Sequence, residues 1–197
     1  MPEDTSAIWA ILSAAIERRK ADGSNQWQDG YPNEEVIAND IAHQYGYVLT
    51  EDNEILGYVA LLINNEPAYE AIKGKWLTNA DFMVFHRVAI SPDHLGCGLA
   101  KFLLQKIEEI AHNKGIPSLR ADTNFDNAPM LHLFEKLGYK YCGEVTFRGT
   151  PRKNYESRIT HLFRTFYYRR TQGTFFTGDK RAYQSLYGSD GRCIPNA

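Results

Sequence analysis

The sequence predicts an α/β fold in which helices cover a mixed β-sheet. Two observations carry this prediction. Apolar residues recur at helical spacing in some segments and at strand spacing in others, and these segments follow one another as two helices, three strands, a helix, a strand, a helix and a strand. The 197 residues are 43% apolar and 23% charged, which is the balance of a folded domain and not of a disordered chain.

The first part of the chain predicts two helices. Apolar residues recur at helical spacing between about residues 6 and 20, and Gly, Asn and Pro break the pattern in "ADGSNQWQDGYPN". Asn33 is placed to cap a second helix that runs to about Gln44. Trp27 and Tyr31 of the connecting loop are interpreted either as a small apolar cluster or as a wall of a ligand pocket.

A change of period then predicts the sheet. "YGYVLTEDNEILGYVALLIN" predicts a hairpin around the turn "EDNE", and residues 81–90, "DFMVFHRVAI", predict a third strand. Two glycines, Gly96 and Gly98, precede a helix that ends near Lys114. The strand "SLRADT", a helix capped by Asn127 and the strand "YKYCGEVTF" complete the predicted order.

The loop "SPDHLGCGLAK" joins a strand to a helix N-terminus, which is an arrangement that binds anions. The first N–H groups of a helix have no intrahelical partner, the helix dipole is positive there, and missing Cβ atoms let a phosphate approach. The triphosphate pattern GxxxxGK[ST] is absent. The dinucleotide pattern GxGxxG fails at Lys101, and five residues separate Ile90 from the first glycine. Another phosphate-bearing ligand and a plain turn both stay open on these residues alone.

Composition and charge limit the other classes. No apolar run approaches the roughly 20 residues that cross a bilayer, and the N-terminus carries acidic residues where a signal peptide has basic ones, so we expect a cytoplasmic protein without a membrane partner. The three cysteines lack the paired spacing of a zinc site, and no metal is expected. Residues 152–197 contain nine Lys or Arg against three Asp or Glu, whereas the remainder contains 13 against 21. We expect this basic end to lie against the chain's own acidic surface, and nucleic acid is an unfavoured partner because no recognition motif accompanies the charge.

Two signatures, in this order, resemble the GNAT superfamily of N-acetyltransferases. The first is a strand ending in the apolar pattern "VAI", a proline-containing loop, and a glycine motif that opens a long helix, Leu95 to Ala100. The second is "NAPMLHLFEKLGY", Asn127 to Tyr139. The resemblance covers about residues 8–155. It implies a mixed, centrally splayed sheet flanked by helices in a domain of residues 1–155, followed by a basic C-terminal extension of residues 156–197.

The resemblance also implies acetyl-CoA as cosubstrate. Its pyrophosphate would lie on backbone N–H groups of the glycine motif, and its pantetheine arm would lie beside the strand that ends in "VAI". The cofactor-binding residues implied in this way are Val88, Ala89, Ile90, Leu95, Gly96, Cys97, Gly98, Leu99, Ala100 and Asn127.

Two positions depart from the family pattern. Leu95 stands where the family has Gln or Arg, so a side-chain contact to the phosphates is missing. Phe134 stands where many members have a Tyr that protonates the departing thiolate. A GNAT-like module that holds CoA or acyl-CoA with little turnover is therefore the alternative to an enzyme. Tyr139 is a weaker candidate for the missing hydroxyl.

Acetyl transfer to an amine needs a group that removes a proton. His86 is the candidate general base: it precedes Ile90 by four residues, and strand alternation would place both on one face. A histidine at the matching position takes part in proton removal in arylalkylamine acetyltransferases. The alternative is a partly buried histidine bonded to backbone.

The expected acceptor is a primary amine of a small molecule or a protein amino group. Aromatic residues near the predicted site are the candidates for its pocket, namely Trp27, Tyr31, Tyr69 and Trp76. The resemblance is also compatible with a homodimer, since many relatives dimerise.

Overall fold

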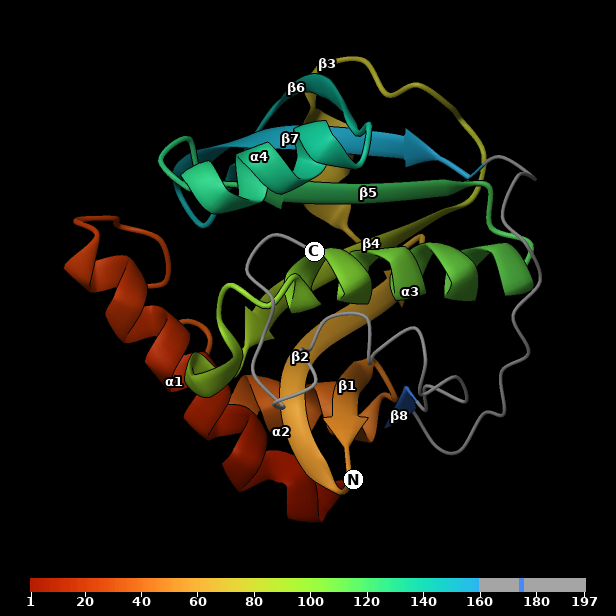
Figure 1. The fold of residues 1–197 in the computed structure, drawn as a ribbon. Coiled ribbons are helices and arrows are strands. Elements are labelled where there is room, and N and C mark those ends of the chain that lie inside the picture. Colours follow the sequence, from red (N-terminus) through yellow and green to blue (C-terminus); the bar gives the residue numbers. More distant parts are fainter. Residues whose placement is uncertain (160–173, 176–197) are drawn as a thin grey trace. The chain divides into compact units, whose positions relative to one another are not determined.

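The computed structural model describes residues 1–159 and 174–175 (Figure 1). It divides into two compact units. The first contains Met1–Ala60, Arg87–Lys106 and the described residues 174–175, and the second contains Leu61–His86 and residues 107–159. Most of the predicted basic extension lies outside the described residues.

The first unit is built from two N-terminal helices and a hairpin. Strands β1 and β2 pair antiparallel through a two-residue turn in which Asp52 and Asn53 have φ values of +43° and +71°. This left-handed backbone is the one that Asp and Asn tolerate in hairpin turns, and the predicted hairpin is confirmed. The bounds are η1 Pro2–Asp4, α1 Thr5–Ala21, α2 Glu34–Ala42, β1 Gly46–Glu51, β2 Glu54–Ile63 and β8 Thr174–Phe175, which pairs parallel with β1.

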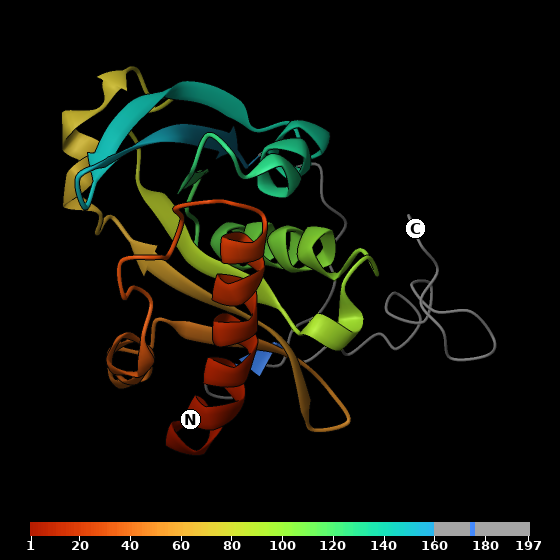
Figure 2. The same cartoon turned by 90° about the vertical axis from the view of Figure 1, so that its left-hand side faces the viewer.

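Helices α1 and α2 bury their apolar faces against this hairpin, and α1 lies across β1 and β2 in Figure 2. Asn33 caps α2 as predicted, because its side chain accepts a hydrogen bond from the N–H of Val36 at 3.0 Å. Trp27 packs against the buried cluster of this unit, which fits the apolar-cluster interpretation. The buried members of the cluster are Ile8, Ile11, Leu12, Ala15, Ile37, Val48, Tyr58 and Ala89.

The second unit contains five strands in the order β3-β6-β7-β5-β4. Strands β6 and β7 form an antiparallel hairpin, β7 pairs antiparallel with β5, and β5 pairs parallel with β4. Helix α4 lies over β5 and β7 (Figure 1). The remaining bounds are η2 Pro67–Ala71, β3 Lys73–Gly74, β4 Phe82–Ile90, η3 Pro92–His94, α3 Leu99–Asn113, β5 Ser118–Thr123, α4 Ala128–Lys136, β6 Lys140–Phe147 and β7 Thr150–Arg158.

The pairing of β4 with β5 is short. It joins Phe82–Val84 to Ser118–Arg120, whereas β5 pairs with β7 along all six of its residues, 118–123. Within the described residues of the second unit, the parallel ladder therefore ends before Phe85 and His86. This is the splayed arrangement that the sequence predicted, and the predicted α/β fold class is confirmed.

Strand β7 is the main element that the sequence pattern did not predict. Its inward positions are occupied by Arg152, Asn154 and Glu156, which are at most 9% exposed. Apolar alternation, the usual sign of a strand, is replaced here by alternation of polar residues. The predicted boundary between residues 155 and 156 falls inside this strand.

Candidate active site

The glycine loop has the backbone that the sequence predicted for an anion site. Gly96 and Gly98 have φ values of +80° and +72°, in the left-handed region that favours glycine, and α3 begins directly afterwards at Leu99. The side chain of Leu95 is 44% exposed. The N–H groups at the start of α3 thus follow two glycines, which have no side chain that would hinder an approaching anion.

The strand before this loop is held closely by β2. The N–H of Ser91 donates to the carbonyl of Leu56 at 2.8 Å. A Cβ atom at Gly57 would lie 3.2 Å from the carbonyl oxygen of Ala89 and 2.9 Å from the end of the Ile90 side chain, so a larger residue there would require both neighbours to shift. Ala89 and Ile90 are buried and Val88 is partly buried.

Asn127 has a structural role that accounts for its position. Its Oδ1 atom accepts a hydrogen bond from the N–H of Met130 at 3.3 Å and caps α4, as predicted. Its contact with a cofactor stays a prediction.

Arg87 interrupts the regular geometry of β4. Its φ is +58°, which is strained for a residue with a side chain. The guanidinium donates to both carboxylate oxygens of Asp40, at 2.9 and 2.7 Å, and to the hydroxyl of Tyr31. Strand alternation therefore cannot be carried across Arg87, and the placing of His86 and Ile90 on one face stays a prediction. Tyr31, a predicted pocket residue, lies in this network of the first unit.

His86 has a carboxylate beside each ring nitrogen. Nε2 lies 2.9 Å from Oε2 of Glu66, out of line for a hydrogen bond, and Nδ1 lies 3.9 Å from Oδ1 of Asp122. The ring stacks on Phe147 with centroids 6.3 Å apart, and the side chain is only 12% exposed. The imidazole is therefore flanked by two carboxylates in a largely buried position.

Asp122 is fixed by donors from two other elements. Its Oδ1 atom accepts from the hydroxyl of Tyr69 at 2.9 Å, and its Oδ2 atom accepts from Nη1 of Arg152 at 3.2 Å. The carboxylate is 3% exposed. Burial, together with the neighbouring Asp122, raises the pKa of Tyr69 well above its ordinary value, so this phenol stays a hydrogen-bond donor.

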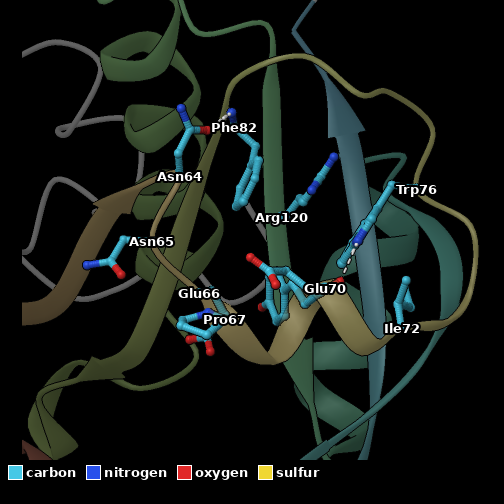
Figure 3. Close-up of a pocket in the computed structure, with 10 residues that line it drawn as sticks. Asn64, Asn65, Glu66, Pro67, Glu70, Ile72, Trp76, Phe82 and Arg120 are labelled. Atoms are coloured by element: carbon cyan, nitrogen blue, oxygen red, sulfur yellow. Dashed lines mark hydrogen bonds between the residues drawn. The ribbon is translucent and has the colours of Figure 1, made fainter.

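A pocket of about 300 Å³ adjoins this cluster in the second unit (Figure 3). Tyr69 and Trp76, two of the candidate acceptor-pocket residues, line it, and Glu66 connects it to His86. That this pocket takes the acceptor stays a prediction. The indole N–H of Trp76 donates to the carbonyl of Tyr69 at 3.2 Å. The full lining is Asn64, Asn65, Glu66, Pro67, Tyr69, Glu70, Ile72, Trp76, Phe82 and Arg120.

The guanidinium of Arg120 lies against two aromatic rings of this pocket. Its central carbon is 4.3 Å from the ring centroid of Trp76 and 4.0 Å from that of Phe82. It also donates to the carbonyl of Thr78 at 2.7 Å and lies 3.5 Å from the buried carboxylate of Glu156. Arg120 therefore fixes the aromatic wall (Figure 3).

Phe134 and Tyr139 form an aromatic cluster with Phe85. Phe134 is fully buried, and the hydroxyl of Tyr139 finds no hydrogen-bond partner among the described residues. Burial, and to a smaller extent Glu108, raises the pKa of Tyr139 well above its ordinary value. Its proton is therefore hard to remove, and the candidacy of Tyr139 as a general acid receives no support from this environment.

The neighbouring Glu108 predicts a pH effect on stability. Burial, followed by the charge of Glu109, raises its pKa from 4.5 to about 7. The folded chain then binds a proton that the unfolded chain releases above about pH 4.5, so this carboxyl costs stability as the pH rises from 4.5 through 7.

Glu108→Gln should therefore match the unsubstituted chain in stability at pH 4.5 and exceed it by about 1 kcal/mol at pH 8, after allowance for solvent screening of a partly exposed group. Urea unfolding at the two pH values measures this difference. Glu135→Gln, at an exposed site on α4, is the control. An equal gain in both variants at pH 8 would show that general surface charge, and not burial of Glu108, is responsible.

Several residues of the cluster were not predicted from sequence. Glu66, Asp122 and Arg152 belong to the segment before η2, to β5 and to β7, and no sequence spacing connects them. The usable signal was polar residues at inward strand positions, as in β7. Among the described residues no group of three His, Cys, Asp or Glu side chains is arranged to hold a metal ion, and no helix is long and apolar enough to cross a membrane.

A family model, the acetyltransferase (GNAT) family, matches residues 12–139, which is more than half of the chain. The matched part includes the glycine loop, His86 and α4. The chain belongs to the GNAT acetyltransferase family. The resemblance stated from the two sequence signatures is confirmed, together with the prediction of an enzyme. Acetyl-CoA, the acetyl donor of the GNAT family, is confirmed as the cosubstrate at the level of the family.

The chain is similar to solved and curated GNAT proteins. A GNAT-family acetyltransferase from Streptococcus agalactiae is 38% identical with a TM-score of 0.74, over 82% of this chain and 92% of that one. The L-methionine sulfoximine/L-methionine sulfone acetyltransferase of Pseudomonas aeruginosa is 27% identical over 142 residues, which are 72% of this chain and 70% of that enzyme. YncA from Salmonella typhimurium, solved with its cofactor acetyl-CoA, is 18% identical with a TM-score of 0.58, over 82% of this chain and 91% of that one, and shows the fold alone. The chain spans 60% to 72% of the length of the curated relatives that it matches.

Proposed function

We propose that this GNAT chain transfers the acetyl group of acetyl-CoA directly to a primary amine of a small molecule, with His86 as the group that takes the proton. The observation that carries the proposal is the buried imidazole between Glu66 and Asp122, beside a pocket that Glu66 also lines. A pocket of about 300 Å³ is of the size that small ligands occupy. The small-molecule acetyltransferase among the relatives supports the same acceptor class.

The glycine loop supports binding of the donor. Acetyl-CoA supplies a thioester when bound, and its pyrophosphate suits the N–H groups at the start of α3. Leu95 contributes no donor from its side chain. We propose that binding there depends on backbone N–H groups, from Leu95 to Ala100.

The side chains of the second unit determine which groups can give or take a proton during the transfer. An amine attacks only when neutral, so a proton must leave the acceptor nitrogen as the new C–N bond forms and the C–S bond breaks. We assign that proton to the imidazole of His86. Phe134 has no proton for the departing thiolate, which takes one from water, and the imidazolium of His86 returns its proton to the hydroxide that this leaves.

Gly96→Ala tests the loop. The alanine must adopt a φ near +80°, and although nothing lies within 4 Å of the new Cβ, this backbone costs about 1 kcal/mol. We expect the Kd for acetyl-CoA, measured by calorimetry, to rise about 5- to 10-fold as the loop relaxes out of its left-handed turn.

Gly115→Ala is the matched control for that variant. Gly115 has a φ of +69° and equally open surroundings, but it follows the far end of α3. It should lose similar stability and keep its Kd for acetyl-CoA. An unchanged Kd in Gly96→Ala, or an equal rise in Gly115→Ala, would argue against a cofactor role of the glycine loop.

A second function has one observation in its favour. Phe134 is fully buried, so its ring position cannot present a hydroxyl to a thiolate. This favours a module that holds CoA or acyl-CoA with little turnover. Release of free thiol from acetyl-CoA across a panel of amino acids, polyamines and aryl amines separates the two functions. Tight binding of acetyl-CoA with no thiol release for any amine would favour the module that holds CoA or acyl-CoA with little turnover.

A further inference from the structure

We infer that Asp122 is a positioning residue for His86 and sets the charge state in which the imidazole works. The inference rests on the proposed function in one respect, namely that His86 takes the proton. It adds a residue to which the sequence analysis gave no part in the acetyl transfer, and which acts through the imidazole and not on the substrate.

The first step is that Asp122 is rigidly held. Tyr69 from η2 and Arg152 from β7 each donate to a different carboxylate oxygen, at 2.9 and 3.2 Å. The side chain is 3% exposed, so water does not replace these contacts. A carboxylate bound from two elements keeps its distance of 3.9 Å to Nδ1 of His86.

The two ring nitrogens of His86 have different surroundings. Glu66, at Nε2, lines the pocket, whereas Asp122, at Nδ1, is not among the residues that line it. Oδ1 of Asp122, at 3.9 Å, lies beyond hydrogen-bond distance of Nδ1, so Asp122 acts on the ring through its charge. Nε2 is the ring nitrogen on the pocket side, and Oε2 of Glu66 lies 2.9 Å from it.

The third step is the charge balance around the ring. The groups that face His86 are Glu66 before η2, Tyr69 on η2, Asp122 on β5, Phe147 on β6 and Arg152 on β7. Tyr69 stays neutral because burial raises its pKa. Two carboxylates therefore oppose one guanidinium around the ring, which is an excess of one negative charge. If Asp122 loses its charge, the negative charge of Glu66 and the positive charge of Arg152 balance each other.

Asp122→Asn tests this directly. We expect kcat to fall about 10- to 100-fold, a part of what a general base contributes. The midpoint of the pH dependence of kcat should move to lower pH, while the KM for acetyl-CoA stays unchanged. Asp122→Glu, which keeps the charge, should recover part of the rate. Tyr69→Phe removes one donor to the carboxylate and should give a smaller loss, so the inference can be tested even if Asp122→Asn does not fold.

Glu156→Gln is the matched control. Glu156 is as deeply buried as Asp122 and accepts from Ser118 and Thr78, but His86 is not among its contacts. It should lose stability without any movement of the pH midpoint. An equal movement in Glu156→Gln, or none in Asp122→Asn, would show that Asp122 only neutralises Arg152.

One readout does not depend on turnover. The ring proton signal of His86 in NMR, assigned by its absence in His86→Gln, should titrate at lower pH in Asp122→Asn than in the unsubstituted chain. If this shift occurs but neither protein acetylates any amine, the coupling stands and the proposed function fails. If the chain is active and the signal titrates unchanged in Asp122→Asn, the coupling fails and the proposed function stands.

Discussion

His86→Gln should lower kcat for the best amine acceptor about 10²- to 10⁴-fold, the contribution typical of a general base. Glutamine retains hydrogen-bonding groups and most of the side-chain volume, so the approach to Glu66 is kept, while the ring stack on Phe147 is lost. The glycine loop is unaffected, and calorimetry should give an unchanged Kd for acetyl-CoA. The loss should be largest near neutral pH and smaller at alkaline pH, where more of the free amine is already neutral.

His132→Gln supplies the control for this result. His132 lies exposed on α4 and has no part in the cluster around Asp122. Its variant should keep full turnover and the same pH dependence. Full turnover in His86→Gln as well would mean that the amine loses its proton to water, and the role of His86 as general base would have to be given up.

The sequence predicted the parts of the fold whose apolar residues repeat. Helix α3, the hairpin of β1 and β2, and the helix capped by Asn127 all follow from periodicity and capping. Strand β7 did not follow, because its inward residues Arg152, Asn154 and Glu156 are polar. The burial of these residues is stabilised by partners on other strands, such as Asp122 and Ser118, which no local pattern reports.

The candidate site likewise contains residues that the sequence indicated and residues that it did not. The glycine loop could be proposed from the sequence because its chemistry would lie in consecutive backbone groups, and His86 because the resemblance marked its position; both roles stay predictions. Glu66 and Asp122 were not, since the path from either to His86 runs through the tertiary fold. Strand alternation alone could not decide the face of His86, because Arg87 takes a left-handed backbone that no residue type announces.

The left-handed backbone of Arg87 costs stability, and the contacts of its side chain must offset this cost. Asp40→Asn, which removes the counter-charge, should reveal it as a loss of stability. Asp40 is 2% exposed, accepts two hydrogen bonds from Arg87, and accepts a third from the hydroxyl of Tyr58 at 2.6 Å. Burial, with the adjacent Asp40, raises the pKa of Tyr58 far above its ordinary value, so Tyr58 stays neutral and cannot replace the lost charge. Asparagine would therefore leave a buried guanidinium without a counter-charge, which costs about 3 kcal/mol.

Urea unfolding of Asp40→Asn against Asp126→Asn, an exposed position in the loop before α4, measures this cost. The control should change by less than about 0.5 kcal/mol, as surface substitutions usually do. The bent backbone at Arg87 gives a second, independent readout. If the ion pair holds the left-handed conformation, Asp40→Asn should also speed hydrogen exchange of the β4 amides next to Arg87, beyond what its global loss of stability accounts for. A loss of stability without faster local exchange would mean that packing around Arg87, and not its ion pair with Asp40, maintains the bend.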